Sequence, residues 1–159
     1  MKIKLAKGQK APQEAILALE AALGARRSES FRSFVDVHDG AEPSNNVFRL
    51  LDNDSAGVNE FIPVIDVWKQ RAYIENIPTK AYPIASASCD NYVLIDEGQN
   101  GAVFFGDHEL PDKLTKLARS FAAFLERLEP FDPDSIQLKP GQVERVWIDP
   151  EFLKKLRKD

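Results

Sequence analysis

The chain has 159 residues, a formal net charge of −4 and a hydrophobic content of 43%, which is ordinary for a globular protein. This length suits one domain with a core that needs no metal, and the single cysteine, Cys89, excludes an internal disulfide. The sequence has no apolar run of signal-peptide or membrane-spanning length, so we expect a cytoplasmic protein.

Two helices are predicted near the start of the chain. Pro12 suits the first turn of a helix over residues 13–23, and Gly24 would end it. Ser28 is a candidate N-cap for a second helix over residues 29–37. Apolar residues at helical spacing give each helix one buried side, formed by Ile16, Leu19, Leu23, Phe31, Phe34 and Val35.

The next segment predicts shorter elements. Residues 41–46 are typical of a loop, residues 47–51 of a short strand, and residues 52–59 of a polar turn. Pro63 lies near the start of a third predicted helix over residues 61–74. We expect its core contacts to come from Ile65, Trp68 and Tyr73.

A β-hairpin is predicted at the centre of the fold. Two short apolar runs, residues 92–95 and 102–105, are separated by turn-forming residues 96–101. Neither run alternates between apolar and polar residues, so we expect both faces of this hairpin to be covered. Residues 82–85 predict a third strand, with Pro83 at a sheet edge or at a strand start.

The clearest periodic pattern lies in residues 113–128, where leucine, alanine and phenylalanine recur every three or four positions. It predicts one helix with Asp112 as its N-cap. This helix would pack on the sheet and bury Phe121 and Leu125.

Together these elements predict an α+β fold: a single domain with a mostly antiparallel sheet, a central hairpin and helices packed against it. We expect a flexible, lysine-rich lead over residues 1–11, the domain over 12–130, and a C-terminal extension over 131–159. The extension would contain a strand over residues 143–148 and a short basic helix, packed on the same domain.

Charge is distributed unevenly along the chain. Residues 34–112 contain fourteen acidic and only four basic residues, and residues 81–112 contain six acidic residues and no lysine or arginine. If these acidic residues lie on one sheet edge and its loops, they form a negative surface that would attract a basic partner and repel nucleic acid. On the sequence alone, the favoured interpretation is an ordinary solvated surface with scattered acidic residues.

The sequence contains no phosphate-binding glycine loop, no pair of CxxC motifs and no GxSxG or HExxH motif. We therefore expect no enzyme, no cofactor and no metal. A hydrolase built on Asp90, Asp96, Asp107 and His108 is a weaker alternative that requires these side chains to converge. Asp107, His108 and Glu109 are adjacent, and neighbours in an extended chain point to opposite sides, which disfavours a metal site.

Four segments resemble the SUKH superfamily, which includes the yeast cell-wall glucan-synthesis regulator and many bacterial proteins. They are YPIA (residues 82–85), DNYVLID (90–96), GAVFFGDHE (101–109) and LARSFAAFLERL (117–128). The resemblance covers about residues 13–129, and Asp90-Asn91 stands where the superfamily often has Gly-Asn. It implies one α+β domain without known catalysis, which in bacteria often serves as an immunity protein against a toxin.

We therefore expect a non-catalytic domain that binds a cognate, basic toxin protein through an acidic face around the hairpin. A regulatory scaffold that recruits a host protein is the alternative, and neither function requires nucleic acid or membrane. The expected partner-binding residues are Asp90, Asp96, Glu97, Asp107 and Glu109, with Asp39 and Glu42 on a neighbouring loop.

Overall fold

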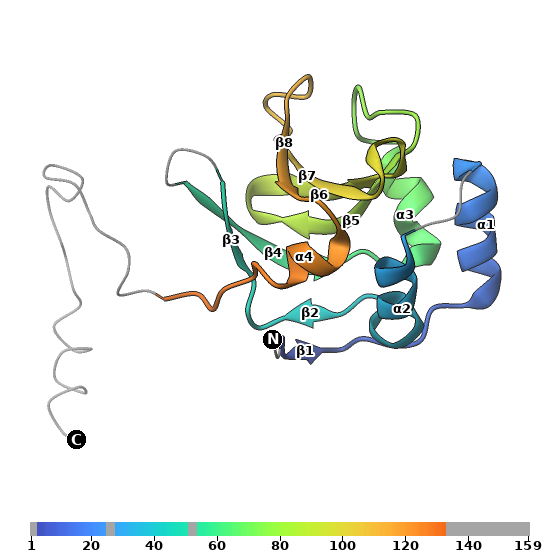
Figure 1. The fold of residues 1–159 in the computed structure, drawn as a ribbon, viewed down its shortest axis with the longest axis horizontal. Helices are drawn as coiled ribbons and strands as arrows, with labels where there is room; N and C mark the ends of the chain where they lie inside the picture. Colours follow the sequence, from blue (N-terminus) through green and yellow to red (C-terminus); the bar gives the residue numbers. More distant parts are fainter. Residues whose placement is uncertain (1–2, 25–27, 51–53, 133–159) are drawn as a thin grey trace, which may run out of the picture.

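The protein folds around a six-stranded antiparallel sheet, seen in a computed structural model that describes residues 3–24, 28–50 and 54–132 (Figure 1). The strand order follows the chain, so each strand pairs with the strand before it and the sheet is a meander. This confirms the predicted α+β fold with a mostly antiparallel sheet. The strands are β3 (Val47–Arg49), β4 (Ser55–Phe61), β5 (Ala81–Ala87), β6 (Asn91–Asp96), β7 (Ala102–Gly106) and β8 (Leu114–Ala118).

Helices α1 (Gln13–Leu23) and α2 (Glu29–His38) confirm the first two predicted helices. Gly24 ends α1 in the left-handed conformation, with φ of 60°. The Ser28 hydroxyl accepts a hydrogen bond from the Phe31 amide at 3.4 Å and so caps α2. Helix α1 lies beside α3 (Val64–Arg71), and α3 in turn packs on β5 (Figure 1).

The main core lies between the helices and one face of the sheet. Phe121, which is fully buried as predicted, is at its centre. Its ring makes edge-to-face contacts with the rings of Phe34, Phe31 and Phe61, at centroid distances of 5.1, 5.2 and 6.0 Å. These contacts join α2, β4 and α4 (Phe121–Leu125) into one aromatic cluster.

The other face of the sheet carries a second, smaller cluster, formed by Ala81, Leu94, Ala102 and Phe104. Successive residues of a strand point to opposite faces, so in β6 Val93 and Ile95 join the main core while Leu94 joins the second cluster. In this second cluster, Leu94 of β6 pairs with Phe104 of β7. The predicted hairpin, with both faces covered, is therefore confirmed.

Of the two positions predicted for Pro83, the sheet edge is wrong for β5 as a whole, which lies between β4 and β6. The alternative, a position near a strand start, is confirmed, because Pro83 is the third residue of β5 and precedes Ala85–Ala87, the part that pairs with β4. The β5–β6 register shifts between Pro83 and Ala85, which marks a bulge. A proline has no amide hydrogen to donate, and a bulge is where a central strand can tolerate that loss.

The single helix predicted over residues 113–128 is also wrong. Residues 114–118 form β8, and only residues 121–125 form α4. Strand β7 is buried, and its backbone groups need partners on the side that β8 occupies. Ser120 has an extended backbone, and its hydroxyl accepts from the Ala123 amide at 3.2 Å, so Ser120 rather than Asp112 is the N-cap.

The segment before β5 differs from its prediction in extent. Strand β4 begins at Ser55, inside the predicted turn, and α3 is shorter than the predicted helix at both ends, since it begins after Pro63 and ends at Arg71. Its buried residues are Val64 and Val67. The three predicted core contacts are exposed instead, at 67% for Ile65, 45% for Trp68 and 75% for Tyr73.

The described part of the lead, which begins at Ile3, contacts the domain at two places. Strand β1 (Leu5–Ala6) pairs with β2 (Glu42–Pro43), which lies in the predicted loop over residues 41–46, and Gln9 pairs with Asp39. The predicted strand over residues 143–148 and the basic helix lie outside the described residues. Of the helices that the structure describes, none has the length and apolar character needed to cross a membrane.

Candidate functional site

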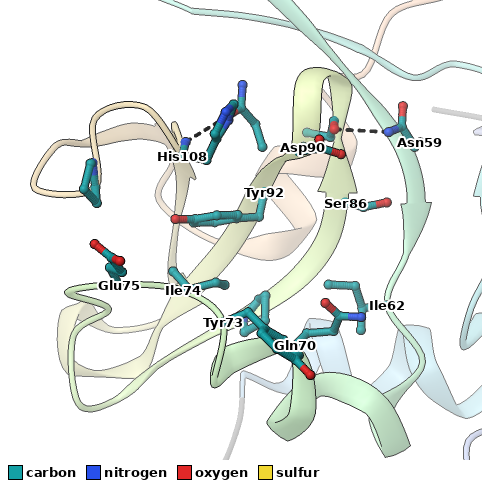
Figure 2. Close-up of a pocket in the computed structure, with 14 residues that line it drawn as sticks. Asn59, Ile62, Gln70, Tyr73, Ile74, Glu75, Ser86, Asp90, Tyr92 and His108 are labelled. Atoms are coloured by element: carbon teal, nitrogen blue, oxygen red, sulfur yellow. Dashed lines mark hydrogen bonds between the residues drawn. The ribbon is translucent and has the colours of Figure 1, made fainter.

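A cavity of about 550 Å³ opens where the β5–β6 turn, the loop after α3 and the loop after β7 meet (Figure 2). Cavities of this volume are typical of ligand-binding sites. The lining residues come from several strands and their connecting segments, and they are Asn59, Ile62, Gln70, Tyr73, Ile74, Glu75, Pro83, Ser86, Ala87, Asp90, Asn91, Tyr92, His108 and Pro111. We call this cavity the Tyr92 pocket.

Tyr92 occupies the middle of the pocket, with its hydroxyl directed toward the side on which Glu75 lies (Figure 2). The side chain is half-buried and packs against the second apolar cluster. Its cross-strand partner is Gly106, and a Cβ atom at Gly106 would lie 2.3 Å from Tyr92 Cε2. The missing side chain of Gly106 therefore makes the space that the Tyr92 ring occupies.

Asn91 fixes the loop after β7 at the rim of the pocket. Its side-chain oxygen accepts a hydrogen bond from the His108 amide at 3.0 Å and lies 2.9 Å from His108 Nδ1. The same loop is closed by the Glu109 amide, which donates to Asp107 Oδ1 at 2.9 Å. These bonds hold an exposed histidine and two carboxylates close to the start of β6.

The β5–β6 turn holds Asp90 on the opposite side of the pocket from Glu75 (Figure 2). Cys89 and Asp90 both have left-handed backbone conformations, with φ of 60° and 56°. This conformation costs a residue other than glycine roughly 1–2 kcal/mol, although aspartate tolerates it better than most. The turn therefore sets the direction of the exposed Asp90 side chain.

The pocket has a negative character. Asp90 and Glu75 line it, and none of its lining residues in the described part of the chain is a lysine or arginine. Burial raises the pKa of the Tyr92 phenol, and the negative charges of Asp107 and Glu75 raise it further. The hydroxyl at the centre of the pocket therefore lies in a field that would favour a cation.

The seven predicted partner-binding residues fall into two groups. Asp90, Asp107 and Glu109 lie at or beside the Tyr92 pocket, and they are exposed or half-buried. The other four do not line the pocket or neighbour a residue at its rim; each binds another group of the chain, and two of them, Asp39 and Asp96, are buried. The structure thus gathers only part of the predicted acidic face in one place.

Asp96 and Glu97 lie at the end of β6 away from the pocket. Asp96 accepts hydrogen bonds from the Gly98 amide at 2.8 Å and from the Gln99 side chain at 3.0 Å, which closes the hairpin turn. Glu97 Oε1 accepts from the Ser28 amide at 2.9 Å and from the Tyr82 hydroxyl at 2.8 Å. Glu97 therefore ties the start of α2 to the sheet.

Asp39 and Glu42 are also bound within the chain. Asp39 accepts a hydrogen bond from the Val64 amide at 2.9 Å, which satisfies a free donor in the first turn of α3. Glu42 forms an ion pair with Lys7 at 2.7 Å, and this pair raises the pKa of the lysine.

The set required for a hydrolase does not converge. Asp90, Asp107 and His108 lie toward one end of β6, while Asp96 is at the other end of this six-residue strand, roughly 16 Å away at the usual rise per residue. Within the described ranges, no three histidine, cysteine, aspartate or glutamate side chains are grouped so that they could hold a metal ion.

Sequence reasoning missed Tyr92, Glu75 and Tyr73 as residues of the site. The sequence predicts Tyr92 only as part of an apolar strand, and Tyr73 as a core contact. One signal was available for Tyr92: Gly106 ends the partner strand of the hairpin, and a glycine opposite an aromatic residue leaves room for the ring to lie flat on the sheet.

A second concave surface lies between α1 and α3. It has a volume of about 170 Å³ and an apolar lining, formed by Ala15, Ala18, Leu19, Ala22, Val64, Ile65 and Trp68. The Arg71 guanidinium lies 4.9 Å from the centre of the exposed Trp68 ring.

Comparison with curated proteins gave no match. Comparison with family models gave one that covers residues 10–127, and thus α1 to α4 and the whole Tyr92 pocket. It agrees with the resemblance carried by the hairpin and the segment after it. The chain belongs to the SMI1 / KNR4 family (SUKH-1).

Proposed function

We propose that this protein is an immunity protein, which binds a cognate toxin protein and neutralises it through the face around the Tyr92 pocket. The observation that carries the proposal is a concave site that, within the described ranges, is lined by carboxylates and by no lysine or arginine. The SUKH family is known as a non-catalytic, immunity-protein-like fold, which supports a binding function rather than a reaction.

Electrostatics supports a basic partner. Asp90 and Glu75 line the Tyr92 pocket, and Asp107 and Glu109 are the neighbours in sequence of His108, which also lines it. The fields of these four carboxylates add and would speed the approach of a positively charged protein. Toxins that cleave nucleic acid need positively charged grooves, and an acidic protein can cover such a groove. Four residues are left out of the proposed interface because they bind groups within the chain and neither line the pocket nor neighbour His108 at its rim: Asp39, Glu42, Asp96 and Glu97.

The proposal is tested in two steps. The first is affinity capture from the native organism at low salt, which should yield a protein toxin. The second compares the association rate of the captured partner with the wild-type protein and with an Asp107→Asn/Glu109→Gln variant. Both substitutions keep the size of the side chain, and the amide oxygen introduced by Asp107→Asn can still accept the hydrogen bond from the backbone amide of residue 109.

We expect the variant to associate severalfold more slowly at low salt, with the difference shrinking as salt rises. The matched control is Glu14→Gln/Glu126→Gln, which removes the same charge from exposed positions outside the pocket. Equal association rates for the pocket variant and the control would contradict the acidic-face proposal.

One observation favours the alternative, a scaffold that recruits a host protein. The apolar surface between α1 and α3 exposes Ile65 and Trp68, and its apolar lining does not depend on the charge of a partner. Capture of a partner that is not a toxin, with binding lost in Trp68→Ala and retained in the Asp107→Asn/Glu109→Gln variant, would move the function to this class.

A further inference from the structure

We propose that the Tyr92 pocket binds one arginine side chain of the protein partner, with the guanidinium against the Tyr92 ring and paired with the Glu75 carboxylate. This inference rests on the proposed protein-binding function but not on the partner being a toxin. It names the chemical group that the pocket would recognise.

The first argument is that the two carboxylates that line the pocket are available to bind a partner. Among the described residues, no hydrogen bond or ion pair engages the side chain of Glu75 or that of Asp90. Four of the acidic residues that were expected to bind a partner differ, because Asp39, Glu42, Asp96 and Glu97 each bind a group of the chain. Glu75 and Asp90 are therefore the lining carboxylates that can accept donors from a partner at the pocket.

The second argument is the aromatic surface. Tyr92 is held by the cluster beneath it and by the space at Gly106, so its ring is positioned before a partner arrives. Tyr73 borders the same cavity from the loop after α3 (Figure 2). A cation over a tyrosine ring gains roughly 0.5–2 kcal/mol, most where water is excluded.

The third argument separates arginine from lysine. The lining offers acceptors in a spread arrangement: the carboxylates of Glu75 and Asp90 and the side-chain oxygens of Gln70, Ser86 and Asn59. A guanidinium has five donors in one plane, can stack on a ring while it donates sideways, and loses less hydration than an ammonium group. The cavity of about 550 Å³ has room for the side chain and part of its backbone.

The opposite charge at the rim is small. Among the described lining residues, His108 has the one side-chain nitrogen that can carry a positive charge. Its backbone amide donates a hydrogen bond to the Asn91 side-chain oxygen, and its Nδ1 also lies beside that oxygen. The Arg71 guanidinium is already bound elsewhere in the chain, because it donates hydrogen bonds to the backbone oxygens of Ala81, Pro78 and Thr79. The two lining carboxylates therefore outnumber the groups in the described lining that can carry a positive charge.

The test titrates the full-length protein with three short probes, followed by NMR: acetyl-Gly-Arg-Gly-amide, the same peptide with lysine, and the same peptide with citrulline. Citrulline has the shape of arginine without its charge. We expect the arginine probe to shift the resonances of Tyr92, Tyr73 and Ser86. It should bind at least about fivefold more tightly than the lysine probe and about tenfold more tightly than the citrulline probe.

Three variants locate the site. Glu75→Gln should weaken the arginine probe about fivefold, Tyr92→Leu should weaken it about tenfold, and Tyr92→Phe should restore most of the affinity because it keeps the ring. Glu126→Gln, which is exposed and outside the pocket, should leave the affinity unchanged. Equal affinity of the arginine and citrulline probes, or shifts that do not map to the pocket, would overturn the inference.

The captured partner distinguishes this inference from the function on which it rests. If Glu75→Gln leaves partner affinity unchanged while Asp107→Asn/Glu109→Gln lowers it, the acidic face stands and the arginine site fails. If neither variant changes partner binding, both proposals fail. Loss of affinity in both variants supports both.

Discussion

Gly106 sets the position of the Tyr92 ring, so Gly106→Ala should damage the pocket while it leaves the fold almost intact. The added Cβ would lie 2.3 Å from Tyr92 Cε2 and 2.8 Å from Cδ2, whereas carbon atoms in contact prefer about 3.5–4.0 Å. The ring must therefore move by more than about 1 Å, and the open side of the half-buried residue is the pocket itself.

The expected change in stability is small because two effects oppose each other. An off-rotamer Tyr92 side chain costs about 0.5–1.5 kcal/mol. Replacing a strand glycine with alanine recovers roughly 0.5–1 kcal/mol of conformational entropy, and Gly106 has no positive φ that alanine would resist. The free energy of unfolding, measured in urea, should therefore change by about 1 kcal/mol or less.

Binding should respond more strongly than stability. With the ring displaced into the cavity, affinity for the arginine probe and for the captured partner should fall about tenfold. Gly24→Ala is the matched control, because Gly24 has φ of 60° with open space around it and lies outside the pocket. It should lower stability by roughly 1 kcal/mol and leave binding unchanged. Wild-type affinity in Gly106→Ala, or a loss of stability that exceeds the control, would refute the reasoning.

Three further predictions concern the core, the caps and the titration of Tyr92. Phe121→Ala should lower the free energy of unfolding by about 3–5 kcal/mol, since its ring contacts three others, and a loss below about 1 kcal/mol in urea denaturation would contradict the aromatic core. Asp39→Ala should cost about 1–2 kcal/mol by removing the acceptor for the Val64 amide, whereas Glu42→Ala should change stability by less than about 0.5 kcal/mol because its ion pair is exposed; equal losses would show that the cap has no special weight. Tyr92 should titrate above the ordinary tyrosine value of 10.0 in ultraviolet absorbance, and Asp107→Asn should lower its midpoint. Because the folded pKa is raised, the stabilisation from the neutral phenol is complete below about pH 10 and is lost as pH rises through the folded value; a midpoint that ignores Asp107 would contradict this.

The helices and the hairpin could be predicted because their signals are local. Ser28 and Gly24 cap their helices through backbone groups a few residues away, and the two arms of the hairpin are joined by a short turn. The segment over residues 113–128 could not be predicted in this way. Its leucine spacing fits a helix, but residues 114–118 instead supply hydrogen-bond partners to the backbone of β7. That pairing depends on a distant strand, so it cannot be read from the segment's own sequence.

The candidate site was predictable only in part, for a related reason. Nothing in the sequence of residues 81–112 distinguishes a carboxylate that accepts hydrogen bonds within the chain from one that is available to bind a partner. Asp96 and Asp90 are at opposite ends of one strand, and only the fold shows that Asp96 closes a turn while Asp90 borders a cavity. The sequence predicts Tyr73 in the core because a helix running to residue 74 would bury it, but α3 ends at Arg71.

The meander has a consequence for the order in which the sheet can form during synthesis. Each strand from β4 to β8 pairs with the strand made just before it, so every hairpin can close without a segment that emerges much later. One contact breaks this order: Val47, in the edge strand β3, exchanges backbone hydrogen bonds with Glu129 at 3.0 and 2.8 Å. Strand β3 can therefore complete its pairing only after α4 has emerged. It is synthesised first among the strands of the sheet, but its edge is covered last.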